Sequence, residues 1–168
     1  MEPLEAAAIV WDLPEPFTVD VVVSARDIDE YGHTNNAVYL SWCDRVAWAH
    51  TAAVGLDARD HHRMGRAMVA RRTHIEHLAP SLAGEPVRVG NWIVFADGRL
   101  RATRRYQICR LTDGLTLVRA ITMFVCIDLR TGRPRRWPAE FRERYVVLPS
   151  VQQALTRAAS PFAAIPGR

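Results

Sequence analysis

A short polar segment holds the side chains of this chain that are best suited to chemistry. Residues 27–36 read Asp-Ile-Asp-Glu-Tyr-Gly-His-Thr-Asn-Asn and run directly into the apolar stretch 37–56. Two aspartates, a histidine and a glycine-containing turn thus precede an expected helix start, where free backbone N–H groups gather and the dipole is positive. This combination is suited to polarising a carbonyl group. Taken singly, Thr34, Asn35 or Asn36 would serve as an ordinary helix cap.

The basic residues limit the classes of protein to which the chain could belong. All 22 are arginines, because the sequence contains no lysine, and the formal net charge is only +4. A lysine nucleophile or a lysine Schiff base is therefore excluded. The arginines are scattered along the chain and do not form a concentrated basic patch with interleaved aromatic residues. We therefore expect no nucleic-acid partner.

The cysteines and the first residues indicate the compartment. Cys43, Cys109 and Cys126 are an odd, widely spaced set without a Cys-x-x-Cys pair, which argues against disulfides and thiolate metal sites. The first residues carry acids in place of a basic leader, and no apolar run is long enough to span a bilayer. We expect a cytoplasmic protein that has no membrane-spanning part. Cys43, among apolar neighbours, is interpreted as a packing thiol and not as a nucleophile.

Side-chain periodicity predicts the elements that position the polar segment. The stretch 36–54 is apolar around most of its circumference and ends at Gly55, which predicts one long helix that must be enclosed on most sides. β-Branched residues and period-two alternation predict strands at 17–24, 67–78, 87–95, 100–111 and 115–128. Asp97-Gly98 and Asp113-Gly114 predict tight turns that join the last three strands into an antiparallel meander.

The order of these elements predicts the fold class. With 168 residues, 49% of them hydrophobic, the chain is expected to form a single domain over residues 1–168. One strand, a long helix and then further strands predict an α+β fold in which an antiparallel sheet of about five strands wraps the central helix. We expect the core at about 17–138. Residues 139–168 form the expected C-terminal extension, with a short helix or an extended cover at 139–147, a helix at 151–159 and a frayed end at 160–168.

The polar segment resembles the motif of a known family. Residues 27–40 are similar to the Asp-x-x-Gly-His-x-Asn-Asn-x-x-Tyr pattern of the hotdog-fold acyl-CoA thioesterases, specifically their 4-hydroxybenzoyl-CoA thioesterase-like branch. Residues 127–134 also resemble the last strand and turn of that family. The resemblance covers about residues 17–138. It implies the hotdog fold, in which a sheet wraps one long helix.

The resemblance also implies an activity and an assembly. Members of the family hydrolyse acyl thioesters of coenzyme A or of a carrier-protein pantetheine, at sites between the subunits of a homodimer. We therefore expect an acyl-CoA or an acyl carrier protein as partner, and a homodimer or homotetramer. No metal is expected, and no cofactor other than the coenzyme A or pantetheine that is part of the substrate.

Position in the motif assigns the expected site residues. Asp29 matches the catalytic carboxylate, which acts as nucleophile or as general base for water, and Asn36 matches the position whose backbone N–H faces the thioester oxygen. Such a donor stabilises the negative charge that the carbonyl gains on attack. His33 is the third catalytic candidate. The expected substrate-binding residues are Tyr31, Gly32, Asn35, Arg71, Arg72, Arg133, Arg135 and Arg136, of which the arginines would meet the phosphates of coenzyme A. Alternation predicts that only one of Arg71 and Arg72 faces a given groove.

Other residues compete for these roles. Asp27 or Asp44 could supply the carboxylate in place of Asp29. Four histidines could suggest a metal, but His61 and His62 are expected in a charged loop, and strand geometry sends His74 and His77 to opposite faces.

Two other functions stay open beside hydrolysis. These are hydration or dehydration of an acyl thioester, and a non-catalytic module that binds acyl-CoA as a regulator. Release of free thiol from a panel of thioesters distinguishes the three.

Overall fold

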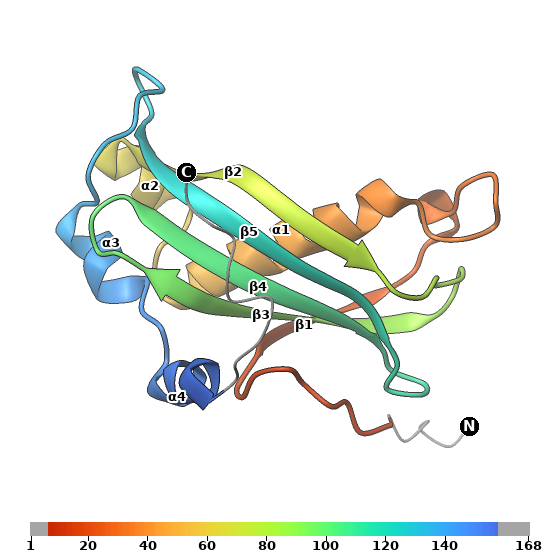
Figure 1. Cartoon of the computed structure of the whole chain (residues 1–168). Helices are drawn as coiled ribbons and strands as arrows, with labels where there is room; N and C mark the ends of the chain where they lie inside the picture. Colours follow the sequence, from red (N-terminus) through yellow and green to blue (C-terminus); the bar gives the residue numbers. More distant parts are fainter. Residues whose placement is uncertain (1–6, 158–168) are drawn as a thin grey trace.

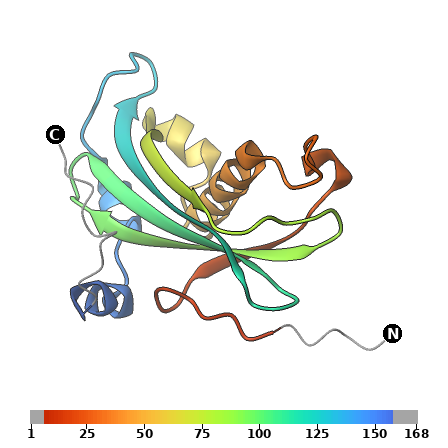
Figure 2. The same ribbon diagram turned by 45° about the vertical axis from the view of Figure 1, so that its right-hand side comes forward.

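The computed structural model describes residues 7–157 of the chain, in which an antiparallel sheet curves around one long helix (Figure 1). The sheet has five strands in the order β1-β3-β4-β5-β2. Their bounds are β1 Phe17–Val22, β2 Arg66–His77, β3 Pro86–Ala96, β4 Arg101–Arg110 and β5 Thr116–Asp128. The predicted α+β class, the wrapped helix and the number of strands are confirmed. Figure 2 shows how strongly the sheet twists as it passes around the helix.

The predicted helix and hairpins are present. Helix α1 spans Asn36–Ala53 and ends just before Gly55, as expected. β3, β4 and β5 pair as consecutive antiparallel neighbours. The turns between them contain Gly98 at φ 65° and Gly114 at φ 71°, backbone angles that glycine adopts without strain. The Asp-Gly signals therefore identified the meander correctly.

The main core lies between one face of α1 and the concave face of the sheet. Tyr39, Trp42, Cys43, Val46 and Ala47 of the helix pack on buried residues of the strands. On the other face Leu40 and Trp48 stay 45% and 44% exposed. The expectation that the helix is enclosed on most sides is therefore wrong for a single chain, because the sheet covers only one of its faces.

The loop after α1 contains a helix that the sequence analysis did not predict. Helix α2 spans Ala58–Met64, and its N-cap Asp57 forms a capping box with Asp60. The Asp-x-x-Asp spacing was the available signal. The expectation that His61 and His62 lie in a charged loop is wrong: both are in α2, and His61 is buried against Trp48 and Phe141.

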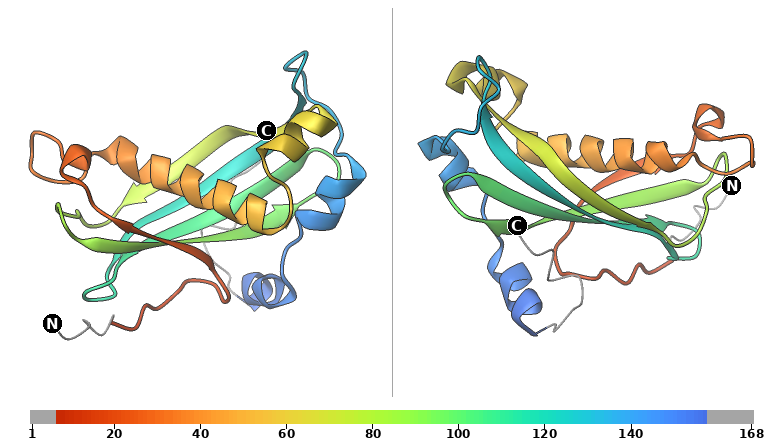
Figure 3. Two further views of the ribbon diagram at one scale, coloured as in Figure 1. Left: turned by 180° about the vertical axis from the view of Figure 1, so that it is seen from behind. Right: turned by 45° about the horizontal axis from the view of Figure 1, so that its top comes forward.

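The C-terminal extension forms two short helices. Helix α3 spans Ala139–Arg144 and α4 spans Pro149–Arg157. Phe141 of α3 belongs to a second core with Trp137 and Tyr145 near the C-terminal end of α1. α4 lies on the face of the sheet opposite α1, where Val151 packs on Leu13 and Trp92 (Figure 3). The predicted frayed end at 160–168 lies outside the described residues. Within residues 7–157, none of the helices combines the length and the apolar character needed to cross a bilayer.

Candidate active site

The segment between β1 and α1 folds into a tight turn around Asp29. Ile28 and Thr34 form an isolated antiparallel bridge, and within it the Asp29 N–H donates to the His33 carbonyl at 2.8 Å. The Asp29 carboxylate accepts a hydrogen bond from the Tyr31 N–H at its Oδ1 atom, at 2.9 Å. Gly32, at φ 80°, closes the turn by donating to the Asp29 carbonyl at 3.0 Å. Asp29 is half-buried, and its Oδ2 atom accepts no hydrogen bond within residues 7–157.

The start of α1 leaves one backbone donor unpaired beside this turn. Asn35 is the N-cap, and its Oδ1 atom accepts from the Ala37 N–H at 2.9 Å while its carbonyl accepts from the Val38 N–H at 2.9 Å. The N–H of Asn36 therefore has no acceptor in the described part of the chain. It lies at the positive end of an 18-residue helix. An oxygen that gains negative charge would be stabilised there.

Asp27, the first alternative carboxylate, stabilises the local fold. Its Oδ2 atom accepts from the Ser24 N–H at 2.8 Å in a capping box of the short 3₁₀ helix η1, Ala25–Asp27. Its carbonyl accepts from the Asn35 N–H at 2.8 Å. Both contacts fix the path of the chain into α1. Asp29, whose Oδ2 atom accepts no hydrogen bond in the described part of the chain, is therefore the better placed of the two aspartates.

A buried hydroxyl network that the sequence analysis missed holds the turn against the helix. The Ser81 hydroxyl lies 2.7 Å from the Thr34 hydroxyl and 2.9 Å from the Tyr39 hydroxyl. The Ser81 N–H donates to the Tyr39 hydroxyl at 3.0 Å, and the Thr34 N–H donates to the Ser81 carbonyl at 2.9 Å. Tyr39 belongs to the motif quoted above, but no local pattern marks Ser81, which lies more than 40 residues from Thr34 and Tyr39.

Replacing Tyr39 by phenylalanine should loosen this network. The Ser81 N–H would lose its acceptor in a buried position, which costs about 1–3 kcal/mol of unfolding free energy. We expect kcat to fall by roughly tenfold as well, because the turn that carries Asp29 is tied to Ser81 through Thr34. Urea unfolding and steady-state kinetics measure the two effects.

Tyr106→Phe is the matched control, since Tyr106 is a buried tyrosine of the same core and lies outside this network. It should change stability without the loss of kcat. Equal kcat values for Tyr39→Phe and wild type would contradict a positioning role for the network.

The remaining predicted residues of the segment are exposed. Tyr31 is 88% exposed, and His33 is exposed too. The His33 backbone helps to form the turn, but its ring makes no hydrogen bond within residues 7–157. Roles for Tyr31 and His33 in binding or catalysis stay predictions.

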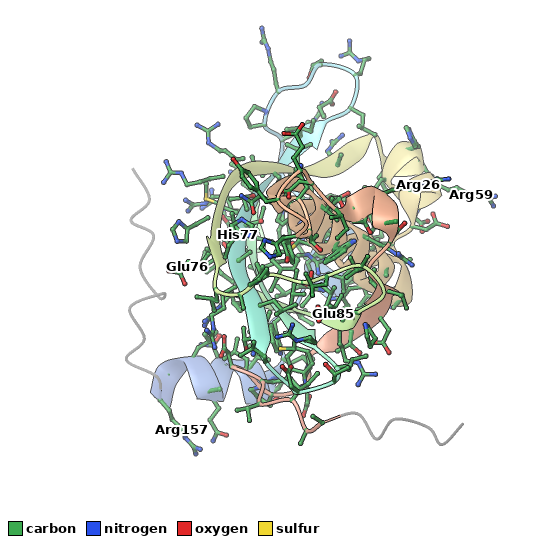
Figure 4. The ribbon with its side chains drawn as sticks, turned by 90° about the vertical axis from the view of Figure 1, so that its right-hand side faces the viewer. Arg26, Arg59, Glu76, His77, Glu85 and Arg157 are labelled. Atoms are coloured by element: carbon green, nitrogen blue, oxygen red, sulfur yellow. The ribbon has the colours of Figure 1, made fainter. Side chains whose placement is uncertain are left out.

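The five predicted arginines do not converge on Asp29 in one chain. Arg133, Arg135 and Arg136 are exposed in the turn after β5, which is bonded to the start of β2 through Leu129 N–H and the Gly65 carbonyl at 3.1 Å. The Asp29 turn lies at the other end of the sheet (Figure 1). There the last residue of β2, His77, packs against Tyr39 with 5.4 Å between ring centroids. Figure 4 shows His77 and Glu76 leaving this end of β2 in different directions.

Two details of these arginines differ from the expectation. Arg135 donates to the Asp128 carboxylate at 2.9 Å and is therefore already paired. Arg71 and Arg72 are exposed in the middle of β2, but the register with β5 shifts between Ala70 and Arg72. The assumption of strict alternation at Arg71 and Arg72 is wrong, because a bulge interrupts the period-two order of side chains.

A cavity of about 250 Å³ lies near the C-terminal half of α1. It is lined by α1, α2 and strands β2, β4 and β5, with Arg104 and Tyr145 in its wall. Asp44, the second alternative carboxylate, lines this cavity. Asp44 lies eight positions after Asn36 on the same helix, which is roughly 12 Å along the axis at 1.5 Å per residue.

The three cysteines are buried, unpaired thiols. Burial raises the pKa of Cys43 to about 12 and that of Cys126 to about 11, and it raises the pKa of Cys109 as well. A thiol with such a pKa holds almost no thiolate at neutral pH. These pKa shifts agree with the interpretation of Cys43 as a packing residue.

The chain is similar to known thioesterases over most of its length. The sequence model of the Thioesterase-like superfamily matches residues 23–145. Acyl-acyl carrier protein thioesterase ATL3, chloroplastic, of Arabidopsis thaliana is 24% identical over 128 residues, which are 76% of this chain and 66%, just under two thirds, of that protein. Long-chain acyl-CoA thioesterase FadM of Escherichia coli (strain K12) is 25% identical over 129 residues, covering 74% of this chain and 92% of FadM.

A solved structure agrees in fold. Slr0204, a 1,4-dihydroxy-2-naphthoyl-CoA thioesterase from Synechocystis, matches with a TM-score of 0.70 and 23% identity over 78% of this chain and 96% of that one. The matches confirm the expected hotdog fold.

Proposed function

The chain belongs to the Thioesterase-like superfamily; on this premise we propose that it is a thioesterase that hydrolyses an acyl thioester of coenzyme A or of a carrier protein, with Asp29 as the catalytic carboxylate. One observation carries the proposal. Within residues 7–157, a carboxylate with one oxygen that accepts no hydrogen bond lies in the turn directly before a helix whose first N–H has no acceptor. The two groups that thioester hydrolysis needs, an attacking or proton-accepting group and an oxyanion donor, thus come from one short segment.

The proposed reaction begins with the thioester oxygen at the Asn36 N–H. Asp29 acts through Oδ2 while the Tyr31 N–H holds Oδ1 in place. In one route Oδ2 attacks the carbonyl carbon, the C–S bond breaks, the thiolate leaves and water hydrolyses the resulting anhydride. In the other route Oδ2 takes a proton from water, which attacks the carbonyl carbon directly. Both routes yield the free acid and the thiol.

We further propose a homodimer formed through β2. β2 is one of the two edge strands of the sheet, and within residues 7–157 its outer backbone edge is unpaired, with exposed residues from Val69 to Arg72. Such an edge pairs readily with a second copy of itself. Exposed Leu40 and Trp48 on α1 offer additional apolar surface for a partner.

Antiparallel pairing of two β2 strands would complete the site. It brings the His77 end of one strand next to the Arg66 end of the other. The Asp29 turn lies at the His77 end, whereas the turn carrying Arg133 and Arg136 lies at the Arg66 end. The arginines that are remote from Asp29 in one chain would therefore approach it from the partner. Met68 and Val69, which line the cavity, lie on the same strand between these ends.

Light scattering tests the assembly. A homodimer of the 19.0 kDa chain should show roughly twice that mass at micromolar concentration, and a tetramer roughly four times. Trp48→Glu places a charge on the exposed face of α1 and should weaken the assembly and reduce activity together. A fully active monomer would contradict the shared site.

Thiol release from a panel of acyl-CoA and acyl-carrier thioesters tests the proposed function itself. Hydrolysis frees the thiol, whereas hydration of an enoyl thioester or mere binding leaves the thioester intact. A chain that binds acyl-CoA without releasing thiol would be a binding module.

A further inference from the structure

Arg104 is a buried cation that forms no ion pair within residues 7–157. It lies on β4, its side chain is among the buried polar groups, and the residue is only 4% exposed. Its Nη1 atom donates to Asn91 Oδ1 at 3.1 Å and to His50 Nδ1 at 3.0 Å, and its Nη2 atom donates to Thr51 Oγ1 at 3.0 Å. The guanidinium also lies over the Tyr145 ring at 5.8 Å from its centroid. No carboxylate within residues 7–157 forms an ion pair with it.

His50 does not supply the missing negative charge. Its Nδ1 atom accepts from Arg104 and also lies 2.9 Å from the Asn91 side-chain nitrogen, so the ring is neutral. Burial and the nearby Arg104 lower the pKa of His50 to about 4, in agreement with this arrangement. Burying an arginine among neutral groups is unfavourable unless an anion joins it.

Arg104 keeps two donors for such an anion. Of the five guanidinium N–H groups, three have the acceptors named above, and the described residues offer no further acceptor for the Nε–H and one hydrogen of Nη2. The same pair of atoms holds a carboxylate elsewhere in this molecule. Arg88 donates to Asp20 through Nε at 2.6 Å and Nη2 at 2.8 Å, and Arg119 donates to Asp12 through Nε at 2.6 Å and Nη2 at 2.9 Å.

The cavity provides room for a ligand beside Arg104. Its wall is largely apolar, with Trp48, Met68, Val69 and Phe124 among the lining residues. Because a cavity of about 150 Å³ holds a benzene molecule, the 250 Å³ here suit one substituted ring or a short chain. An apolar cavity with one guanidinium group in its wall is suited to an apolar group that ends in a carboxylate.

The other ionisable groups of the cavity do not neutralise Arg104. His61 and Tyr145 contact each other, with 3.2 Å between Nε2 and the hydroxyl. Burial raises the pKa of Tyr145, so its hydroxyl stays neutral. Asp44 is the one carboxylate in the lining, and it is exposed and makes no ion pair with Arg104. Solvent screens its repulsion of an anion at the buried end of the cavity.

We infer that Arg104 binds a carboxylate at the remote end of the acyl group, so that the preferred substrates are thioesters of dicarboxylic acids. The inference rests on the proposed thioester hydrolysis and assigns its substrate class. In the proposed dimer the thioester lies at the Asp29 turn of one subunit. The acyl group passes the paired β2 strands, and its far end enters the cavity of the other subunit.

Pairs of acyl-CoA esters that differ only in the remote carboxylate test this specificity. Glutaryl-, adipoyl- and suberoyl-CoA are compared with pentanoyl-, hexanoyl- and octanoyl-CoA through kcat/KM. At least one dicarboxylic ester should exceed its partner by about tenfold or more, the effect of a hydrogen bond to a charged group. Arg104→Met should abolish that preference. No preference in the wild type would overturn the inference without the need for any variant.

Arg105→Met is the matched control. Arg105 is the next residue on β4 and therefore lies on the opposite face of the sheet. It should leave the preference for dicarboxylic esters unchanged. If Arg104→Met and Arg105→Met alter the preference equally, loss of charge alone explains the effect and the assignment to Arg104 is wrong.

A binding measurement separates this inference from the proposed function. In calorimetry the wild type should bind octanoate at least about tenfold more tightly than octanamide, and Arg104→Met should bind the two alike. If no thioester is hydrolysed but octanoate binding depends on Arg104, hydrolysis fails and the anion site stands. If thioesters are hydrolysed but neither assay depends on Arg104, hydrolysis stands and Arg104 is only structural.

Discussion

Replacing Asn36 by proline should lower kcat for thioester hydrolysis by about a hundred- to a thousandfold, the loss expected when one oxyanion donor is removed. Proline lacks the N–H that we assign to the thioester oxygen. The helix should tolerate it, because proline is favoured at the first helical position. The preceding Asn35 already has φ −57° and ψ 135°, the extended conformation that a following proline requires.

Asn36→Ala separates the backbone from the side chain, because it removes the amide side chain and keeps the N–H. We expect this control to stay within a few-fold of wild type in kcat. Circular dichroism and thermal unfolding show whether both variants keep α1. An active, folded Asn36→Pro enzyme would exclude this N–H as the oxyanion donor.

Replacing Asp29 by asparagine should lower kcat by at least roughly a hundredfold with little change in stability or in ligand binding. Asparagine has nearly the same shape, and its Oδ1 atom still accepts the hydrogen bond from the Tyr31 N–H. The turn should therefore persist while the group that attacks or takes a proton is lost. Steady-state kinetics together with thermal unfolding measure both properties.

Asp27→Asn is the corresponding control. It weakens the cap on Ser24 and should reduce stability more than kcat, since Asp27 serves the fold of η1. Asp29→Asn activity close to that of wild type would move the catalytic role to Asp27 or to Asp44.

Local signals were sufficient for most of the fold. Period-two alternation in β3 and the Asp-Gly pairs around Gly98 and Gly114 each depend on neighbouring residues, so the sequence predicted the meander. The helix α2 was missed because its seven residues are too short and too polar to show an apolar stripe. The bulge at Arg71 was missed because strand patterns assume unbroken alternation.

The residues of the candidate site also fall into those that a local motif identifies and those that depend on distant contacts. Asp29 and Asn36 are close in sequence, so a motif could identify both. Ser81 and Arg104 could not be identified, because their roles depend on partners that only the folded chain brings near: Ser81 on Thr34 and Tyr39, Arg104 on His50. The contribution that we propose for Arg133 and Arg136 requires a second subunit, which neither the sequence nor a single chain contains.

Hydrolysis through Asp29 is tested most directly by thiol release from acyl-CoA and acyl-carrier thioesters, measured for the purified protein side by side with Asp29→Asn. We expect steady release from at least one thioester by the wild type and at least roughly a hundredfold slower release by the variant at the same protein concentration. Release at equal rates by both proteins, or no release by the wild type from any thioester of the panel, would contradict hydrolysis through Asp29.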